Sequence, residues 1–598
     1  MAKTVRIGGA SGFWGDSTEN AGQLVLRGEI DFLVFDYLAE VTMSLLARIR
    51  ARKPELGYVP DFIEAVAPLL PEIKRRGIRV VSNGGGVNPS AAAAALKARA
   101  KAAGVSLKIA VVSGDDLMDR LDDVRARGTR EMFSGAPLPD KIMSANAYLG
   151  AQPIAAALDR GADVVITGRC VDSAVTLGVL VHAFGWSWSD YDKLAQASLA
   201  GHLIECSAQV TGGLFTDWRD VPGWDDMGMP IAECGEDGSF VITKPTGTGG
   251  LVTPLTVGEQ MLYEIGDPAA YILPDVVCYF RDVTMEEEGA GRVRVAGARG
   301  RPPTPMLKVS ATWHDGYRMI GTVTLAGHAA AAKGQRAGEA ILARARRLLV
   351  ARGLADFSET SLEVLGAEAT YGPNARPNAN DAREVVVKIG ARHADEKALE
   401  ILAREIAPAA SSMAQGLTGF FAGRPGVQPV MRLFSFLWPK VDITPRVHFG
   451  DDDVPVPFAP SARLAPASGE AIASTQIGQA EAETPLISLA VGRSGDKGNS
   501  ANIGIIARRP DYLPWLRQSL TAEAVQAFFA HTGVSKVDRY ELPGIHALNF
   551  VLHDVLGGGG VASLRIDPQG KAFAQMLMDY PVGVSQLLAD QLALANRK

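Results

Sequence analysis

The chain has 598 residues, which is enough for roughly three to four domains. Hydrophobic residues make up 47% and charged residues 21%, an ordinary composition for a globular protein with full hydrophobic cores. The net charge is -6, and no block of Lys and Arg stands out. This argues against a nucleic-acid or anionic-membrane surface, because phosphate binding needs a basic patch.

The compartment can also be predicted from composition. The four cysteines show no CxxC spacing, so we expect reduced thiols rather than a disulfide framework. The opening MAKTVRIGG runs into a predicted strand and lacks the apolar core of a signal peptide. No run reaches the roughly 18 apolar residues of a membrane span. We therefore expect a cytoplasmic protein with no membrane partner.

Five short runs rich in Val and Ile are the clearest structural signal of the first third. Each run ends in a polar or glycine-rich cluster, and stretches of helical periodicity separate the runs. This pattern predicts buried parallel strands joined by right-handed helical crossovers. We expect residues 1–285 to form an α/β domain with a Rossmann-like, mostly parallel sheet flanked by helices. The five runs are VRIGGASGF, FLVFDYLAE, IRVVSNGGG, IAVVSGDD and VVITGRCVD.

The rest of the chain has a different pattern of hydrophobic residues and a different composition. Residues 286–458 contain LKVSATW and RMIGTVTLAG, which resemble a hairpin, followed by long helical patterns. This predicts an α+β domain with helices on one face of a mixed or antiparallel sheet. Residues 459–484 are small and polar, as in a linker. Residues 485–598 read as a compact C-terminal α+β domain.

Polar side chains follow the predicted strands, and they are the candidate catalytic residues. In open parallel sheets, ligands bind beyond the carboxyl ends of the strands. Crowded acids at such a place repel one another, which raises some of their pKa values toward neutrality. Helix N-capping is the alternative role for these acids, and it suits Asp115 or Asp116 well. Arg169 could clamp an anion or only neutralise the acids. The candidate acids of these strand ends are Asp36, Asp115, Asp116 and Asp172.

Two glycine loops are candidate anion sites. Gly9, Ser11 and Gly12 lie between the first strand and a helix, where backbone amides and the helix dipole favour an anion. The spacing is G-x-x-G-x-x-G, which is neither the dinucleotide fingerprint nor a Walker A loop. Asp36 lies about 20 residues on, where a dinucleotide fold holds its ribose acid. A tight turn explains the same glycines.

The second loop contains Asn83, Gly84 and Gly85. Three consecutive glycines indicate that something approaches the backbone closely. A ligand phosphate or carbonyl is one candidate for this close neighbour, and another loop of the same protein is the other.

Three further segments carry reactive groups. His202, Glu205 and Cys206 share a helix face and could form half of a metal or nucleophile site, although a satisfied buried His and an apolar Cys are the simpler interpretation. Lys244 and Gly249, in ITKPTGTGG, suit a phosphate or carboxylate, or an exposed loop.

The last of these segments is GRSGDKGNS in the C-terminal domain. It holds Arg493 and Lys497, which favours a ligand or interdomain contact over a plain salt-bridged turn.

At these residues the chain resembles the acyclic terpene utilization AtuA family. The resemblance covers about residues 4–450, and the C-terminal segment, over about residues 485–590, resembles the ferredoxin-like domain that often follows in this family. The resemblance therefore implies a ferredoxin-like C-terminal domain. The similar motifs are FLVFDYLAEVTMSLLARI, SNGGGVNP, ANAYLGAQPIAAALDRGADVVITGRCVDSAVTLGVL, AGHLIECSAQVTGG, FVITKPTGTGGLVT and GRSGDKGNSANIG.

The resemblance implies a role in the breakdown of citronellol-type terpenes and other branched acids through acyl-CoA intermediates. The first hypothesis is an enzyme of hydratase or lyase type that acts on acyl-CoA thioesters, without a metal or resident cofactor. The strand-end acids would move the proton, and backbone amides at 83–86 would polarise the thioester carbonyl. The alternatives are a non-catalytic assembly protein for a carboxylase or dehydrogenase, and a nucleotide-dependent oxidoreductase. We expect a homo-oligomer.

Overall fold

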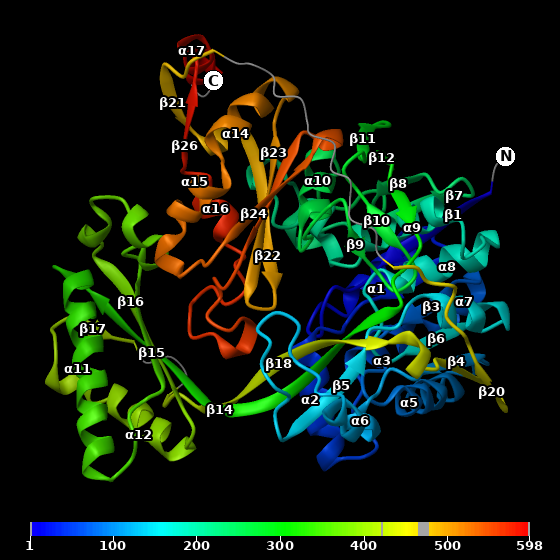
Figure 1. Ribbon diagram of the computed structural model, residues 1–598, viewed down its shortest axis with the longest axis horizontal. Helices are drawn as coiled ribbons and strands as arrows, with labels where there is room; N and C mark the ends of the chain where they lie inside the picture. Colours follow the sequence, from blue (N-terminus) through cyan, green and yellow to red (C-terminus); the bar gives the residue numbers. More distant parts are fainter. Residues whose placement is uncertain (1–2, 420–422, 464–477, 596–598) are drawn as a thin grey trace.

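The computed structural model describes residues 3–419, 423–463 and 478–595 (Figure 1). A large body contains a long mixed sheet, and the N-terminal strands form the centre of this sheet. A lobe with α11 (Ala330–Ala351) and α12 (Glu396–Ile406) lies to one side of this body, and the C-terminal domain lies above the two. Residues 464–477 of the predicted linker lie outside the described residues. No helix of the described residues is long and apolar enough to cross a bilayer.

The five predicted strands all form, and they are parallel to one another. They are β1 (Thr4–Gly9), β2 (Phe32–Phe35), β3 (Arg79–Ser82), β4 (Ile109–Ser113) and β6 (Val164–Thr167). They lie in the order β1-β2-β3-β6-β4. Because neighbouring strands run in the same direction, their carboxyl ends share one edge of the sheet.

Helices connect these strands and cover both faces of the sheet. Side chains alternate along each strand, so that Val34 packs into one core while Leu33 and Phe35 pack into the other. Asn88 is the N-cap residue of α5, and Pro89 is its first residue, where the fixed φ of proline suits a helix start. The helices are α1 (Glu19–Arg27), α2 (Glu40–Arg52), α3 (Pro60–Val66), α4 (Leu70–Arg76), α5 (Pro89–Ala102), α6 (Leu121–Ala126), α7 (Gln152–Asp159), α8 (Ala174–Phe184) and α9 (Tyr191–Ile204).

The complete sheet has eleven strands and is mixed, so the expectation of a mostly parallel sheet holds only for its centre. Antiparallel strands β7 (Ile231–Gly235), β8 (Phe240–Thr243), β12 (Val293–Ala296) and β11 (Thr284–Glu287) extend it beyond β1. Strands β19 (Arg446–Phe449) and β20 (Asp452–Pro455) extend it beyond β4. Short connections such as β7–β8 allow only antiparallel pairing.

The expected boundary at residue 285 does not separate two sheets. Strand β11 (Thr284–Glu287) crosses it, and strands from both sides of the boundary pair within the eleven-stranded sheet. The final strands before the linker also return to this sheet. The domain built on the eleven-stranded sheet therefore contains strands from both sides of residue 285.

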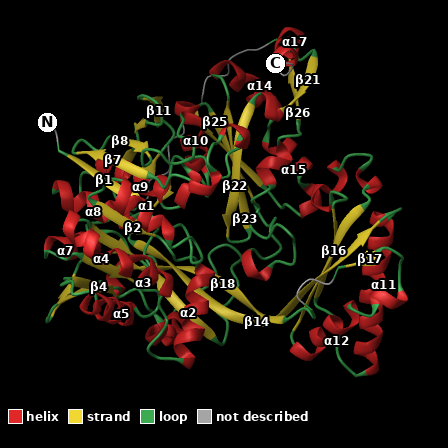
Figure 2. Ribbon diagram, turned by 180° about the vertical axis from the view of Figure 1, so that it is seen from behind, coloured by secondary structure: helices red, strands yellow, loops and turns green. Residues whose placement is uncertain are grey.

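The lobe is connected to the body by the long strand β14 (Met306–Ala326), which runs between the two alongside its antiparallel partner β18 (Val427–Pro439) (Figure 2). Its first half pairs with β5 (Ile142–Ala147) and its second half with β16 (Glu384–His393). The predicted hairpin in this segment is wrong. Asp315 and Gly316, the latter at φ +68°, lie where the pairing with β18 (Val427–Pro439) shifts register, so they form an irregularity within β14 rather than a turn.

The lobe's remaining elements complete a sheet that α11 and α12 cover on one face. They are β15 (Glu359–Leu365), β17 (Leu417–Thr418) and the short α13 (Ala409–Ser412). Residues of α11 and α12 pack against alternate residues of β16, among them Val385 and Val387.

The C-terminal domain is α+β, as expected. Its antiparallel sheet has the order β22-β23-β25-β24, formed by β22 (Ala490–Lys497), β23 (Ser500–Ala507), β25 (Ala547–Leu552) and β24 (Val537–Leu542). A small second sheet pairs β21 (Ala482–Pro485) with β26 (Pro581–Val584). The helices of this domain are α14 (Leu513–Ser519), α15 (Ala522–Phe528), α16 (Phe573–Leu577) and α17 (Gln586–Ala595).

The C-terminal domain packs against the main body through one helix. Helix α10 (Pro254–Leu262) contacts both β22 and β23. Strands β9 (Tyr271–Ile272), β10 (Val277–Tyr279) and β13 (Arg299–Arg301) form a separate small sheet beside α9. These connections place the C-terminal domain next to the strand ends of the main sheet.

Candidate functional site

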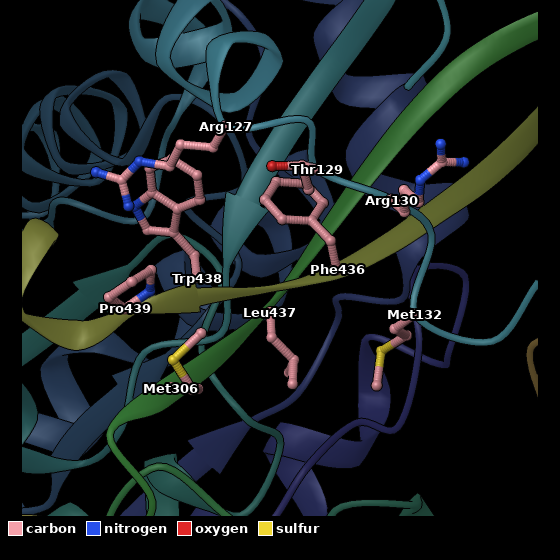
Figure 3. A pocket seen from close by; sticks show the side chains of 9 residues that line it. All are labelled: Arg127, Thr129, Arg130, Met132, Met306, Phe436, Leu437, Trp438 and Pro439. Atoms are coloured by element: carbon pink, nitrogen blue, oxygen red, sulfur yellow. The ribbon is translucent and has the colours of Figure 1, made fainter. Parts of the chain in front are cut away.

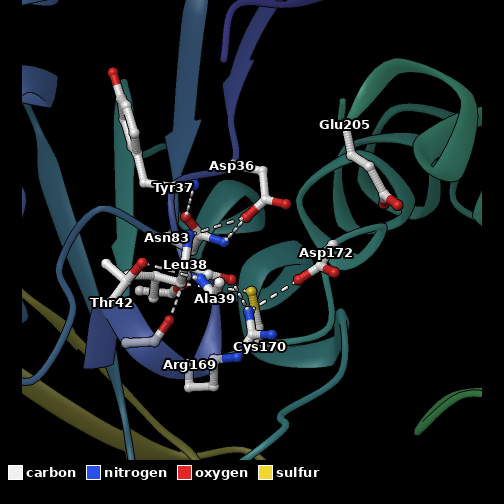
Figure 4. A network of polar contacts seen from close by, with 12 residues as sticks. Asp36, Tyr37, Leu38, Ala39, Thr42, Asn83, Arg169, Cys170, Asp172 and Glu205 are labelled. Atoms are coloured by element: carbon white, nitrogen blue, oxygen red, sulfur yellow. Dashed lines mark hydrogen bonds and ion pairs between the residues drawn. The ribbon is translucent and has the colours of Figure 1, made fainter. Parts of the chain in front are cut away.

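The ends of β1, β2 and β3 are tied together by side chains. The Ser11 hydroxyl donates to the Asp36 backbone carbonyl at 2.9 Å. The Asn83 amide nitrogen donates to the Asp36 carboxyl group, and its oxygen accepts from the Tyr37 amide at 2.8 Å (Figure 4). Asn83 and Asp36 are buried. The predicted ligand residues Ser11 and Asn83 therefore position Asp36.

Arg169 follows β6 and brings a fourth strand end into the cluster. Its Nη1 donates to the Leu38 carbonyl at 2.7 Å and to Asp172 Oδ1 at 2.9 Å. The guanidinium lies 4.2 Å from the centre of the Tyr148 ring. Because the Arg169 side chain is almost fully buried, its ion pair with Asp172 is strongly oriented.

Glu205 comes from a different element, directly after α9. Figure 4 shows the carboxyl groups of Asp36, Asp172 and Glu205 converging from three elements. The side chain of Asp172 is 38% exposed, whereas that of Glu205 is 10% exposed. The cluster is therefore buried on two sides and reaches solvent at Asp172.

Burial controls the charge of this cluster. It raises the pKa of Asp36 well above its ordinary value, and the charge of Asp172 raises it further. The pKa of Glu205 is raised for the same two reasons, and the cations Lys497 and Arg169 oppose the shift. Both groups therefore favour the protonated form near neutral pH.

The hydrogen bonds of His202 also indicate a protonated Glu205. Burial lowers the pKa of His202 to about 4, so its imidazole is neutral. Nε2 lies 3.1 Å from the Met261 carbonyl, which can only accept, so Nε2 carries the proton. Nδ1 is then an acceptor, and its 3.1 Å contact with Glu205 Oε1 requires the proton to be on the carboxyl group. His202 itself is a satisfied buried histidine.

Asp115 and Asp116 lie beyond the end of β4 and have structural partners. Asp115 accepts from the Arg169 amide at 2.9 Å and from the Asn146 side chain at 2.8 Å, and burial raises its pKa to about 6. Asp116 accepts from the Met118 amide at 2.9 Å, as a capping residue does. These contacts favour a structural role for Asp115 and Asp116, which is to hold the ends of β4 and β6 together, over a role in proton transfer.

The glycines of the two loops have close neighbours within the protein. A Cβ atom on Gly9 would lie 2.3 Å from the Ile204 carbonyl oxygen, and one on Gly12 would lie 2.9 Å from the Cys206 Cα. A Cβ on Gly85 would lie 2.4 Å from the Thr167 carbonyl oxygen. These glycines let α9 and β6 approach the loops, which explains them without a bound phosphate.

The amides of these loops are also occupied. The Gly9 amide donates to the Pro230 carbonyl at 3.0 Å, and the Gly12 amide donates to the Asp16 carboxylate at 3.0 Å. The Gly84 amide donates to the Ser82 hydroxyl at 2.9 Å. Asp36, for its part, is buried against Asn83, so its carboxyl group does not face an open ribose site.

Lys244 and Gly249 belong to a different region. Lys244 Nζ donates to the Thr248 carbonyl of its own loop at 2.8 Å. The Gly249 amide donates to the Asp226 carbonyl at 2.8 Å, and a Cβ on Gly249 would collide with the Gly223 carbonyl. The structure does not bring this pair to the acid cluster.

Arg493 and Lys497 approach the same region from the C-terminal domain. Arg493 donates to Gln209 Oε1 at 2.7 Å, and its guanidinium lies 4.7 Å from the Tyr263 ring centre. Lys497 Nζ lies 5.9 Å from the Tyr271 ring centre. Lys497 is thus the predicted ligand residue of this domain that borders the acid cluster.

Sequence reasoning missed Tyr271 and Glu264. Tyr271 lies on the two-residue strand β9, and burial raises its pKa, with further contributions from Glu205 and Asp172. Glu264 has a left-handed backbone at φ +59°, and its charge raises the pKa of Glu205. Neither residue belongs to a motif, so no local signal could have identified them.

Two cavities lie apart from the acid cluster, and no predicted site residue lines either one. The first measures about 480 Å³, and Figure 3 shows the Arg127 guanidinium beside the Trp438 ring on one of its walls. The second, of about 430 Å³, lies between the main body and the C-terminal domain, where Arg508 forms an ion pair with Asp217.

Comparison with known proteins agrees with this two-part organisation. A model described as acyclic terpene utilisation family protein AtuA matches residues 5–449, which contain the acid cluster. A second model, the AtuA ferredoxin-like domain, matches residues 484–583, which contain Lys497. Neither the search of curated proteins nor the search of solved structures found a match. Since the first match spans well over half of the chain, the protein belongs to the AtuA family of acyclic terpene utilisation and carries that family's ferredoxin-like domain.

Proposed function

We propose that the protein is an acid–base enzyme of hydratase or lyase type that acts on acyl-CoA thioesters. Family membership suggests involvement in acyclic terpene utilisation, and the choice of acyl-CoA thioesters as substrates is part of the proposal. The observation that carries the proposal is the convergence of the Asp36, Asp172 and Glu205 carboxyl groups beside Arg169. When the environments of neighbouring carboxyl groups push their pKa values apart, the protonated group can act as the acid and the ionised group as the base.

The ion pair with Arg169 supports Asp172 as the base of the proposed reaction. Asp172 pairs with the Arg169 guanidinium at 2.9 Å, so it is the ionised carboxylate of the set. Its partial exposure lets a substrate reach it. Asp36 and Glu205 hold protons because burial raises their pKa values. One ionised, partly exposed carboxylate beside two protonated carboxyl groups suits proton removal followed by proton return.

The proposed step balances as follows. Asp172 takes the proton on the carbon next to the thioester carbonyl, and the bonding electrons form an enolate. The enolate collapses to a carbon–carbon double bond and expels the hydroxyl at the next carbon. A proton from Asp36 or Glu205 joins this hydroxyl, which leaves as water. Solvent then restores the proton to the acid and removes it from Asp172, and hydration is the reverse sequence.

Three of the four backbone amides at residues 83–86, which were expected to polarise the carbonyl, already have acceptors within the protein. The Gly84 amide donates to the Ser82 hydroxyl, and the Gly86 amide donates to the Asn83 carbonyl at 3.2 Å. Because these donors are already used, the enolate oxygen needs another partner.

Deuterium uptake tests the proposal without requiring knowledge of the full reaction. Isovaleryl-CoA and crotonyl-CoA are incubated with the enzyme in heavy water, and mass spectrometry follows deuterium at carbon. We expect uptake with the wild-type protein and a loss of about a hundredfold or more in Asp172→Asn, which lacks the base. Asp122→Asn, at a fully exposed aspartate of α6, is the matched control and keeps the wild-type rate.

A thermal-shift measurement completes this test. A substrate that binds only the folded state raises the midpoint of unfolding. Wild-type protein that neither exchanges protons nor shifts its midpoint with either thioester would rule out the proposed enzyme. Equal exchange rates in Asp172→Asn and wild type would remove Asp172 from the mechanism.

A further inference from the structure

One face of β22 is directed toward the main body. Side chains alternate along a strand, so Arg493, Gly495 and Lys497 share a face. A Cβ atom on Gly495 would lie 2.3 Å from the Tyr263 ring, so glycine is needed for the approach of that ring. Arg493 is buried on the same ring and bound to Gln209. Lys497 is the exposed member of this row.

Two buried asparagines fix the position of this face. Asn502 donates to the Leu262 carbonyl at 2.6 Å and accepts from the Glu264 amide at 2.9 Å. Asn549 donates to the carbonyls of Ile265 and Gly266 at 3.1 and 2.8 Å. Both side chains are fully buried. Because these bonds replace water on otherwise unpaired backbone groups, they hold the ferredoxin-like domain in one orientation on the segment after α10.

Lys497 therefore occupies a defined place at the acid cluster. Its Nζ lies 5.9 Å from the Tyr271 ring, and its charge lowers the pKa of both Glu205 and His202. Within the described part of the chain, its ammonium group forms no ion pair or hydrogen bond. An ammonium group beside Tyr271, close enough to Glu205 for its charge to act on that acid, has the charge to receive an anionic oxygen.

We infer that Lys497 of the ferredoxin-like domain binds the carbonyl oxygen of the substrate's acyl group, and that the two domains form one active site. This inference rests on the proposed function and names the partner that the enolate oxygen needs. Asp172 removes the proton from carbon, the electron pair moves to the oxygen, and the Lys497 ammonium stabilises the new charge without transferring a proton. A cation placed where charge develops acts more strongly on the transition state than on the substrate.

The test compares Lys497→Met and Lys497→Arg with the wild type. Lys536→Met, at another exposed lysine of the same domain, is the matched control. Isothermal titration measures the dissociation constant of isovaleryl-CoA, and deuterium uptake at saturating thioester measures proton removal. We expect Lys497→Met to lose about a hundredfold in uptake rate and less than about threefold in affinity. Lys497→Arg recovers part of the rate, and Lys536→Met matches the wild type.

Each other outcome overturns the inference. If Lys497→Met exchanges at the wild-type rate while Asp172→Asn does not, Lys497 is not the oxygen's partner, although the proposed function survives. A loss of affinity with an unchanged uptake rate contradicts a role in the transition state. If the wild type neither binds nor exchanges, the proposed function fails and the inference fails with it.

The midpoint of unfolding of each Lys497 variant is the control for folding. An unchanged midpoint shows that the fold of the variant is intact.

Discussion

Glu259 is a carboxyl group buried between the main body and the ferredoxin-like domain. It lies on α10, and its Oε1 accepts from the Thr216 hydroxyl at 2.5 Å. The Gly492 amide of the C-terminal domain in turn donates to the Thr216 hydroxyl oxygen at 3.0 Å. Burial raises the pKa of Glu259 to about 8, so the folded protein holds a proton there that the unfolded chain releases at lower pH.

The sign of the resulting pH dependence follows from proton linkage. Between the ordinary pKa of a glutamate and about 8, the folded state binds more protons at Glu259 than the unfolded state does. The contribution to stability is complete below this window and is lost as the pH rises through it. Asp36 and Glu205, whose pKa values burial also raises, act in the same direction.

We expect Glu259→Gln to remove this dependence, because the amide stays neutral at every pH. The variant should unfold at a higher temperature than the wild type at pH 8.5 and at a similar temperature at pH 5, with a difference in unfolding free energy on the order of 3 kcal/mol at the higher pH. Thermal unfolding followed by circular dichroism measures the difference. Glu286→Gln, at an exposed position of β11, should show no such crossover.

At the scale of the element, β22 determines how the two domains meet. Its Gly495 lies against Tyr263, and Gly504 of the paired strand β23 lies against Leu262. Small residues at these positions let the two strands approach the end of α10. The segment GRSGDKGNS, predicted to be a ligand or interdomain contact, forms most of β22 and its turn into β23. The position of Gly495 supports the interdomain role.

Gly495→Ala tests this contact. The added methyl group would lie 2.3 Å from the Tyr263 ring, so the domains must move apart or the ring must shift. We expect a loss of about 1–3 kcal/mol in unfolding free energy, as for other overpacked sites. Denaturant unfolding measures it. Gly426→Ala, where the new methyl group meets no described residue within 4 Å, should change stability by much less.

At the scale of the whole molecule, the ferredoxin-like domain also braces the lobe. The buried Lys388 of β16 contacts Glu363 of β15 and the Leu564 carbonyl of the C-terminal domain. The Ile566 amide donates to Glu363 Oε1 at 3.2 Å. Arg318 of β14 donates to the Ser563 carbonyl at 3.1 Å. The C-terminal domain therefore contacts both the acid cluster and the far lobe.

Lys388→Met should weaken this bracing. The change leaves the Glu363 carboxylate, whose side chain is 15% exposed, without its cation, and we expect a loss of about 1–3 kcal/mol in unfolding free energy. Adding Glu363→Gln should recover part of the lost stability, because the unpaired negative charge is then removed. Calorimetry and limited proteolysis of the lobe measure both effects. Lys397→Met, at an exposed lysine of α12, is the control, and a similar loss there would contradict the role of the buried pair.

The five strands and their shared edge were predictable from the sequence. A Val- and Ile-rich run between helical stretches can be buried on both faces only as a central parallel strand, so Asp36, Asn83 and Arg169 had to lie at one edge. The chain's membership of the AtuA family was also visible in its motifs.

Only the tertiary structure decided which of these residues act together. Glu205 and Tyr271 reach the cluster through helix packing and a two-residue strand, and Lys497 arrives from another domain. Likewise, the glycine loops were equally compatible with a phosphate and with a neighbouring backbone until α9 and β6 were placed beside them. Local patterns encode burial and strand ends, whereas contacts between distant segments depend on how whole elements pack.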